Sequence, residues 1–371
     1  MGIPQDIRKE FPISEGVIHL NSAAMSLIPH SAVDALLKSL KDGETANEQW
    51  MKNRVEREDR ARQHSAKMIN GSQEDVCMIA NTSEGINIIA QGLAWKKGDN
   101  VVLTDAEFPG NVLPWLNLRK QGVAVTVVRA EYGKDPTERI FAAVNERTKV
   151  VSISFVGWID GFMHDLDEIG RFCRERDIIL AVDAIQGLGA MKIDVKSSKI
   201  SFLAAGGFKW LLSPPGTGIM YIDKELLAHL DQKYVGYLSD RSEAEEFDFT
   251  MNLKDDIMRF RIGSINYPGI AAMAKSLELI LNVGVENIQK HILELIDYAG
   301  KRLLEKSYSV ISPLEAKNRS GILTFGGRNI LEKYFRLADK GILTSYRKEW
   351  LRISPHLFNN KDDIDRLLEE L

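Results

Sequence analysis

The fold is decided by residues 178–221, which read IILAVDAIQGLGAMKIDVKSSKISFLAAGGFKWLLSPPGTGIMY. The stretch opens with an aliphatic run of strand length that is apolar on both faces, as expected for a strand covered by helices on both sides. Asp183 closes this run, and the carboxyl ends of parallel strands are where α/β proteins build their sites. A buried carboxylate there needs a cationic or hydrogen-bonding partner, or it serves as a helix cap or in a core ion pair.

Lys209 stands among small and apolar residues of the same stretch, just before a Pro-Pro-Gly turn. One interpretation is that its stem packs against apolar groups while its ammonium reaches water. The other is that a desolvated lysine loses its proton more easily and becomes an amine nucleophile. Asp183 and Lys209 could pair with each other, or both could contact one ligand.

Upstream of this stretch, short apolar runs alternate with helical patterns, which predicts a mostly parallel α/β sheet. The expected strands are 99–105, 123–129, 149–156 and 178–184, and the expected helices are 110–122, 136–147 and 165–177. The last helix begins with acidic and ends with basic residues, as the helix dipole favours.

After about residue 265 the pattern changes. Residues 269–306 show long helical periodicity, followed by short strands at 320–327 and 350–356 and an amphipathic helix at 361–371. We therefore expect a large domain over 16–265 and a smaller α+β domain formed by 1–15 and 266–371.

The 371 residues are 44% apolar and 27% charged, with a formal net charge of -4. This balance suits a globular protein and gives no electrostatic case for nucleic acid or an anionic membrane as a partner. Neither a secretory signal pattern nor a membrane-spanning run is found, so we expect a cytoplasmic protein. The two cysteines, Cys77 and Cys173, are expected in the core, and they cannot form a zinc site by themselves.

Two segments offer groups for a planar, phosphorylated ligand. Residues 78–93 read as a strand, Asn-Thr-Ser and a helix, so Thr82 or Ser83 is expected at the N-cap, beside free backbone N–H groups that suit a phosphate. Simple capping explains the same pattern. Phe108 directly follows another strand and can lie flat on a ring or belong to the core.

The C-terminal third adds three further candidates. Gly263 and Ser264 stand in a turn near the expected domain boundary, and Arg352 stands in a short strand of the small domain. A guanidinium suits two-point binding of a carboxylate, although a surface arginine is the plainer interpretation. Together, a lysine, a carboxylate, a helix start, an aromatic ring and an arginine match the requirements of pyridoxal 5'-phosphate and an amino-acid substrate.

The order of these residues resembles the class V aminotransferase family of fold-type-I pyridoxal-phosphate enzymes, which includes cysteine desulfurases, selenocysteine lyases and isopenicillin N epimerase-like proteins. The resemblance runs from HLNSAAMSLIP (19–29) to LRISPHLFNNKDDIDRLL (351–368), and its most specific part is VDAIQGLG followed by GGFKWLLSPPGTG. It implies an aspartate aminotransferase-like fold, with a three-layer large domain and a smaller α+β domain.

The resemblance also implies a role for each candidate. Lys209 would form the Schiff base with the cofactor, Asp183 would bond the pyridine nitrogen, and Gln186 would contact the phenolic oxygen. Thr82 and Ser83 match the phosphate-binding turn, and Phe108 matches the residue stacked on the ring. Gly263 and Ser264 resemble the pair that reaches the phosphate of a second subunit, which implies a homodimer with shared active sites. Arg352 matches the arginine that binds the α-carboxylate of the substrate.

Three departures separate this chain from the desulfurase pattern. The segment Gly206 to Lys209 reads GGFK, so two polar phosphate contacts are missing and Phe208 cannot replace them. Trp158 stands where desulfurases have an asparagine near the ring oxygen. The sequence contains no cysteine after Cys173, so the thiol that forms the persulfide is missing.

These features imply an enzyme that moves the α-proton of an amino acid, with Lys209 as general base and acid. We expect an aminotransferase of class V type first, and an epimerase or a β-lyase that works without the thiol second. A third alternative is a regulatory protein that binds the cofactor without catalysis.

Overall fold

The structure is a computed structural model that describes residues 2–13, 16–242 and 246–371. Its centre is a seven-stranded sheet in the order β2-β8-β7-β6-β5-β3-β4. Only β8 runs antiparallel to its neighbours, so the predicted mostly parallel sheet is confirmed. The strands are β2 (Val76–Ile79), β3 (Asn100–Thr104), β4 (Ala124–Val128), β5 (Thr148–Ser154), β6 (Ile179–Asp183), β7 (Phe202–Gly206) and β8 (Gly218–Ile222).

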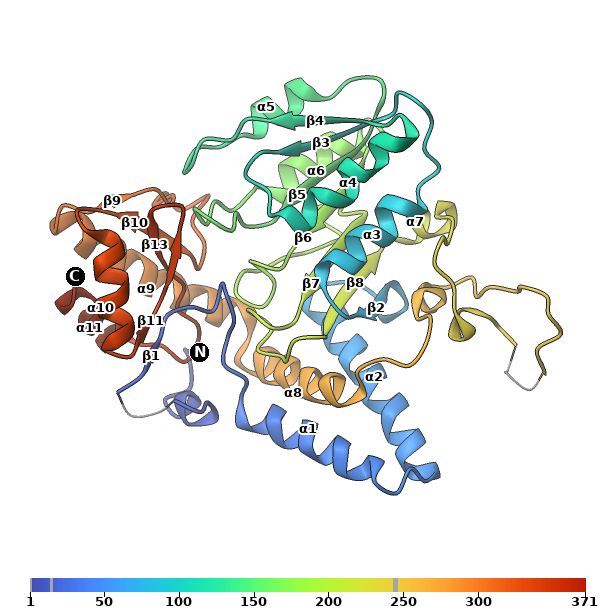
Figure 1. Cartoon of the computed structure of the whole chain (residues 1–371), viewed down its shortest axis with the longest axis horizontal. Helices are drawn as coiled ribbons and strands as arrows, with labels where there is room; N and C mark the ends of the chain where they lie inside the picture. Colours follow the sequence, from blue (N-terminus) through green and yellow to red (C-terminus); the bar gives the residue numbers. More distant parts are fainter. Residues whose placement is uncertain (1, 14–15, 243–245) are drawn as a thin grey trace.

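Six of the seven strands are largely apolar and almost wholly buried, because the sheet is covered on both faces (Figure 1). The expectation of burial on both faces is wrong for β4, where only Val128 is buried, because this strand lies at the edge of the sheet. The α-helices associated with this sheet are α3 (Thr82–Gly92), α4 (Leu113–Asn117), α5 (Thr137–Ala143), α6 (Leu166–Arg174) and α7 (Lys224–His229).

Helix α3 lies directly on β7. A Cβ atom added at Gly85 would come within 2.8 Å of the Ala204 Cβ, so only glycine allows this close approach. The N-terminus of α3 is thereby fixed beside the carboxyl end of β7, where the Lys209 loop begins.

A second group of helices packs beneath the large sheet (Figure 1). It consists of α1 (His30–Gly43), α2 (Glu48–Met68) and α8 (Tyr267–Val283), and α8 contacts both of the others. Most of α8 is buried. Short 3₁₀ helices complete this part of the chain at Ile7–Glu10, Gln73–Asp75, Pro109–Asn111, Leu118–Gln121, Tyr237–Ser239 and Ile257–Phe260.

A smaller four-stranded antiparallel sheet lies to one side, in the order β12-β13-β10-β9 (Figure 1). Its elements are β9 (Ser309–Val310), β10 (Leu323–Gly326), β12 (Ser345–Arg347), β13 (Trp350–Ile353), α9 (Val285–Glu305), α10 (Ile330–Asp339) and α11 (Lys361–Glu369). The expected helices and strands after residue 265 are therefore present, and the predicted long helix is divided into α8 and α9 at Gly284.

The N-terminal segment pairs with this C-terminal region. Strand β1 (Ile18–His19) runs parallel to β11 (Ile342–Leu343), and Asn21 bridges to Ser354. The exact domain boundaries stay a prediction.

Helices α8 and α9 meet at 78°. Among the described residues, no single helix has the length and apolar composition to cross a membrane, and only this bent pair meets both criteria when its two helices are combined.

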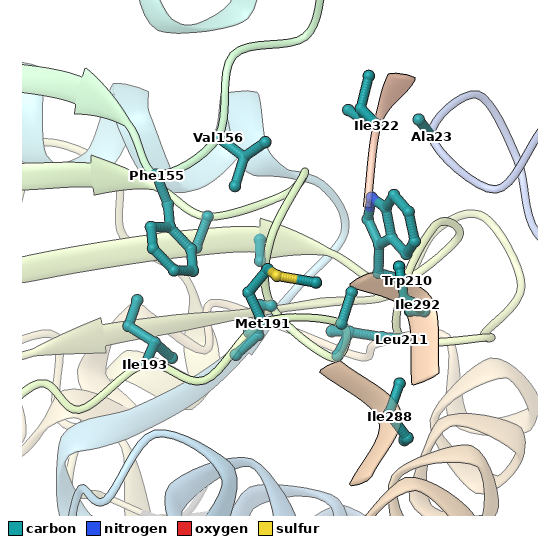
Figure 2. Close-up of a cluster of buried hydrophobic side chains, with 14 of the residues drawn as sticks. Ala23, Phe155, Val156, Met191, Ile193, Trp210, Leu211, Ile288, Ile292 and Ile322 are labelled. Atoms are coloured by element: carbon teal, nitrogen blue, oxygen red, sulfur yellow. The ribbon is translucent and has the colours of Figure 1, made fainter. Parts of the chain in front are cut away.

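Trp210 links the two sheets through a shared apolar core. Figure 2 shows Trp210 beside Leu211, with Ile292 of α9, Ile322 and Ala23 close by. A Cβ atom on Gly321 would lie 2.7 Å from the Trp210 ring, so the backbone there packs directly on the indole. Because Trp210 follows Lys209, this packing fixes the loop that carries the lysine.

Candidate active site

The candidate residues lie at one edge of the large sheet. Strands β2, β3, β6 and β7 share one direction, and the chain leaves their carboxyl ends toward Thr82, Phe108, Asp183 and Lys209. Four segments that are far apart in the sequence therefore meet at the edge where α/β proteins bind ligands.

Lys209 and Asp183 act on each other electrostatically. Burial lowers the pKa of Lys209, the Asp183 carboxylate opposes this shift, and Arg352 and Arg347 add to it. Burial likewise raises the pKa of Asp183. The Asp183 Oδ1 accepts one hydrogen bond from the Ile185 N–H at 3.0 Å, and within the described ranges no other group donates to this carboxylate. It therefore has acceptor capacity left for a ligand.

Phe108 and Trp158 form an aromatic corner beside Lys209. Their rings meet edge to face with centroids 5.4 Å apart, and the Lys209 Nζ lies 5.9 Å from the Phe108 centroid. Phe108 is 45% exposed, which is high for a large apolar ring and leaves a free surface next to the amine. Phe208 brings a second ring to 5.6 Å from the same Nζ.

Arg352 is only 1% exposed and lies on β13. Its Nη1 donates to the Trp158 carbonyl oxygen, whereas its Nε is buried without a hydrogen-bond partner. Burial, with a smaller contribution from the charge of Arg347, lowers the pKa of Arg352 to about 9. No carboxylate among the described residues lies within ion-pair distance of this guanidinium. A buried cation of this kind calls for an anionic ligand.

Gln186 is buried and contacts Trp210, the residue that follows Lys209, and its amide already makes two hydrogen bonds. Its Nε2 donates to the Ala23 carbonyl oxygen at 3.0 Å, and its Oε1 accepts from the Trp210 Nε1 at 3.1 Å. One Nε2 hydrogen remains free for a ligand, so the predicted contact with a phenolic oxygen stays a prediction.

The N-cap of α3 differs from the expectation. The cap is Asn81, whose side chain accepts from the Glu84 N–H at 3.0 Å, and Thr82 is the first helical residue. Asparagine is as good a cap as serine or threonine, and here the first of the three polar residues takes the role. The Thr82 hydroxyl is buried and accepts from the Gly206 N–H at 2.9 Å, which ties α3 to the Lys209 loop. Ser83 is exposed.

Gly263 and Ser264 line a separate cavity of about 400 Å³ together with Ala80 and Glu84 at the start of α3. The Ser264 Oγ lies 3.3 Å from the Tyr237 hydroxyl. Neither Lys209 nor Asp183 lines this cavity, so the structure does not group Gly263 and Ser264 with them within one chain.

Glu107 was not predicted from the sequence. It is buried at the carboxyl end of β3, and burial raises its pKa. Its carboxylate accepts hydrogen bonds from four groups: the Ser154 N–H at 3.0 Å and Oγ at 2.5 Å, the Asn111 Nδ2 at 2.9 Å and the Thr104 Oγ1 at 3.3 Å. The charge of Glu107 also raises the pKa of Asp183. Its position directly before Phe108 was the only available signal.

Both cysteines are free and buried, as expected. Burial raises the pKa of Cys77 and that of Cys173 to about 12, so neither supplies a thiolate at neutral pH.

Solved structures of two related enzymes share this architecture. A cysteine desulfurase from Thermococcus onnurineus NA1, in its apo form, superimposes with a TM-score of 0.91 at 24% identity and covers 100% of this chain and 97% of its own. A lysine-to-alanine mutant of C-DES, with glycine covalently linked to its PLP cofactor, gives a TM-score of 0.91 at 20% identity over 98% of both chains. These matches confirm the predicted fold type.

The family model for aminotransferase class-V matches residues 18–367, and the chain belongs to this family of pyridoxal-phosphate enzymes. A probable cysteine desulfurase from Methanothermobacter thermautotrophicus is 31% identical over 88% of this chain and 82% of that protein. The uncharacterized aminotransferase YcbU from Bacillus subtilis is 24% identical over 100% of this chain and 97% of that protein.

Proposed function

We propose that this chain holds pyridoxal 5'-phosphate through Lys209 and acts on the α-carbon of an amino acid, most simply as an aminotransferase. One observation carries the proposal. Lys209 in the loop after β7, Asp183 on β6 and Arg352 on β13 influence one another electrostatically, and Arg352 has no counter-charge of its own among the described residues. This is the set of groups that an imine-forming cofactor and an α-carboxylate require.

The residues present fit the cofactor. The free acceptor capacity of Asp183 suits a protonated pyridine nitrogen, and the exposed face of Phe108 suits a planar ring. The backbone N–H groups of Thr82 and Ser83 donate to no group of the described chain, so the start of α3 can receive a phosphate. When bound, the cofactor supplies an electron sink for the α-carbon.

Each protein group then has a defined task. Arg352 orients the substrate by its α-carboxylate and fixes the α-hydrogen relative to Lys209. Lys209, with its lowered pKa, is poised to be a neutral amine that accepts this proton and returns it. Asp183 would accept a hydrogen bond from a protonated pyridine nitrogen, and Phe108 with Trp158 would limit the access of water.

The direct test combines a covalent label with product analysis. Borohydride reduction of the protein incubated with the cofactor should place the label on the peptide that contains Lys209, and Lys209→Ala should lose both the label and the visible absorption band. Amino-acid screening with 2-oxo acids should give new amino acids. A Lys209→Ala protein with an unchanged band would contradict the proposal.

A β-lyase is the second candidate, because two relatives of this chain are named probable cysteine desulfurases and a protein of the same fold, C-DES, is a cystine C–S lyase. With both thiols buried, such a reaction would release the β-substituent directly and not through a persulfide on this chain. Formation of pyruvate and ammonia without any 2-oxo acid would favour the lyase, and a strict need for a 2-oxo acid would favour the aminotransferase.

A homodimer with shared sites is part of the same proposal. The described residues between 234 and 251 include four exposed large apolar side chains, Tyr234, Tyr237, Phe249 and Met251, and the Tyr237 hydroxyl lies 3.3 Å from the Ser264 Oγ. Light scattering of the purified protein tests the dimer, and a monomer that retains full activity would contradict shared sites. Cytoplasmic localisation also stays a prediction.

A further inference from the structure

Arg347 shares one face of the small sheet with Arg352. In the antiparallel pair β12–β13, Ser345 lies opposite Arg352 and Arg347 lies opposite Trp350. Residues two apart on a strand point to the same side, so Arg347 and Arg352 project from the same face as diagonal neighbours. Such neighbours have backbones about 7–8 Å apart, which is within reach of two long side chains.

This face is turned toward the candidate active site. The Thr324 Oγ1, opposite Arg352 on β10, donates to the Ile159 carbonyl oxygen at 2.5 Å, and Arg352 itself donates to the Trp158 carbonyl oxygen. The Ser345 Oγ donates to Asn21 at 2.5 Å. The loop with Trp158 and the N-terminal segment therefore cover part of this face of the small sheet. Arg347 lies on the same face, one diagonal position away from Arg352.

Arg347 has no acidic partner among the described residues. Its one hydrogen bond goes from Nη1 to the carbonyl oxygen of the adjacent Tyr346, at 2.9 Å, and its side chain is only half-buried. The positive charge of Arg347 nevertheless acts on the candidate active site, because it contributes to the lowered pKa of both Lys209 and Arg352. An α-carboxylate bound to Arg352 would leave this second cation unpaired.

We infer that Arg347 is a second anion-binding group, and that the substrate is an amino acid whose side chain carries a negative charge, such as a carboxylate or a sulfinate. The inference rests on the proposed function, because it takes Arg352 as the α-carboxylate site. In this arrangement Arg352 selects amino acids in general, whereas Arg347 selects among them by the charge at the far end of the side chain.

Calorimetric titration with unreactive acids tests this selection without any turnover. The protein, with and without cofactor, is titrated with succinate and with propionate, which differ by one carboxylate. We expect succinate to bind at least tenfold more tightly, since a hydrogen-bonded charge pair contributes about 1.5–3 kcal/mol. Arg347→Gln should remove about tenfold of the succinate affinity and change the propionate affinity less than twofold.

Two further variants make the result decisive. Arg347→Lys keeps the charge and should retain most of the preference for succinate, whereas Arg328→Gln, an exposed arginine beyond β10, should change neither affinity. Equal succinate affinity in the wild type and Arg347→Gln would overturn the inference. If Arg352→Gln binds neither acid and Arg347→Gln binds both with wild-type affinity, the inference is overturned and the proposed function is kept. If Arg352→Gln also binds both acids normally, the proposed α-carboxylate site fails as well.

Discussion

Glu107 and Arg352 are both buried charged groups, yet they differ in how many hydrogen-bond partners the protein gives them. Glu107, at the carboxyl end of β3, accepts four hydrogen bonds from the protein, and these bonds stabilise its buried carboxylate. Arg352, on the small sheet, has one carbonyl oxygen as its acceptor and a buried Nε with no partner.

The contrast separates a structural charge from a functional one. A buried charge whose hydrogen bonds are all made within the chain stabilises the arrangement around it, whereas a buried charge without partners lowers the stability until a ligand pairs with it. Glu107 therefore holds the loop of Phe108 in place, whereas Arg352, under the proposed function, would pair with the carboxylate of a substrate.

The largest effect should follow from replacing Arg352. Arg352→Gln removes a charge-assisted contact of about 2–3 kcal/mol with the α-carboxylate, so we expect KM for amino acids to rise roughly 30–150-fold. The free energy of unfolding should stay the same or increase, because an unpaired buried charge is removed. Steady-state kinetics and chemical denaturation measure the two effects. Arg328→Gln, on the surface, should change neither, and a marked loss of stability in Arg352→Gln would contradict the comparison.

The opposite pattern is expected at Glu107. In Glu107→Gln, an amide N–H₂ replaces an acceptor that faces the Asn111 Nδ2, and Asn111 is held in place because its Oδ1 accepts from the Ser152 Oγ and the Trp115 Nε1. Two donors then meet in a buried place, which should cost about 1–3 kcal/mol of unfolding free energy. Denaturation in urea measures this cost. The exposed Glu146→Gln should be neutral, and a Glu107→Gln protein as stable as the wild type would show that the network does not hold the loop.

The smallest effect is the dependence of the unfolding free energy on pH that arises from the buried, neutral His356. His356 Nδ1 accepts from the Leu357 N–H at 2.7 Å and Nε2 lies 3.1 Å from the Trp210 carbonyl oxygen, so the neutral ring is satisfied at both nitrogens. Burial lowers the pKa of His356 from 6.5 to about 4. Between these values the unfolded chain binds the proton and the folded chain does not, so stability is lost as the pH falls from about 6.5 toward 4.

Comparing His356→Gln with the wild type isolates this contribution. The wild type should lose about 1.5 kcal/mol more unfolding free energy than the variant between pH 6.5 and pH 5, within the limit of about 1.4 kcal/mol per pH unit for one group. Melting curves across this range give the difference. The exposed His30→Gln should follow the wild type, and parallel pH profiles for His356→Gln and the wild type would exclude His356 as the group responsible.

Much of this site could be predicted from the sequence, because its signals are local. Asp183 ends an apolar strand, and Lys209 stands in an apolar loop before a Pro-Pro-Gly turn, so both stand out from their neighbours. The long-range partners could not be predicted. The Glu107 carboxylate accepts hydrogen bonds from four groups that lie on three separate segments. Arg347 lies on the same face as Arg352 only because of the register between β12 and β13. Strand register and the choice of edge strand, which also explains the error at β4, depend on tertiary packing.

The pairing of the two chain ends has a consequence for synthesis on the ribosome. The segment that contains Asn21 and Ala23 contacts Ser345, Ser354 and Gln186, so this side of the candidate site is built from residues more than 300 positions apart in the sequence. Strands β2 to β8 end at residue 222 and can form their sheet while the remainder is still being translated. The face that carries Arg347 and Arg352 cannot dock against the N-terminal segment until translation has passed Ser354, so this part of the candidate site forms after the large sheet.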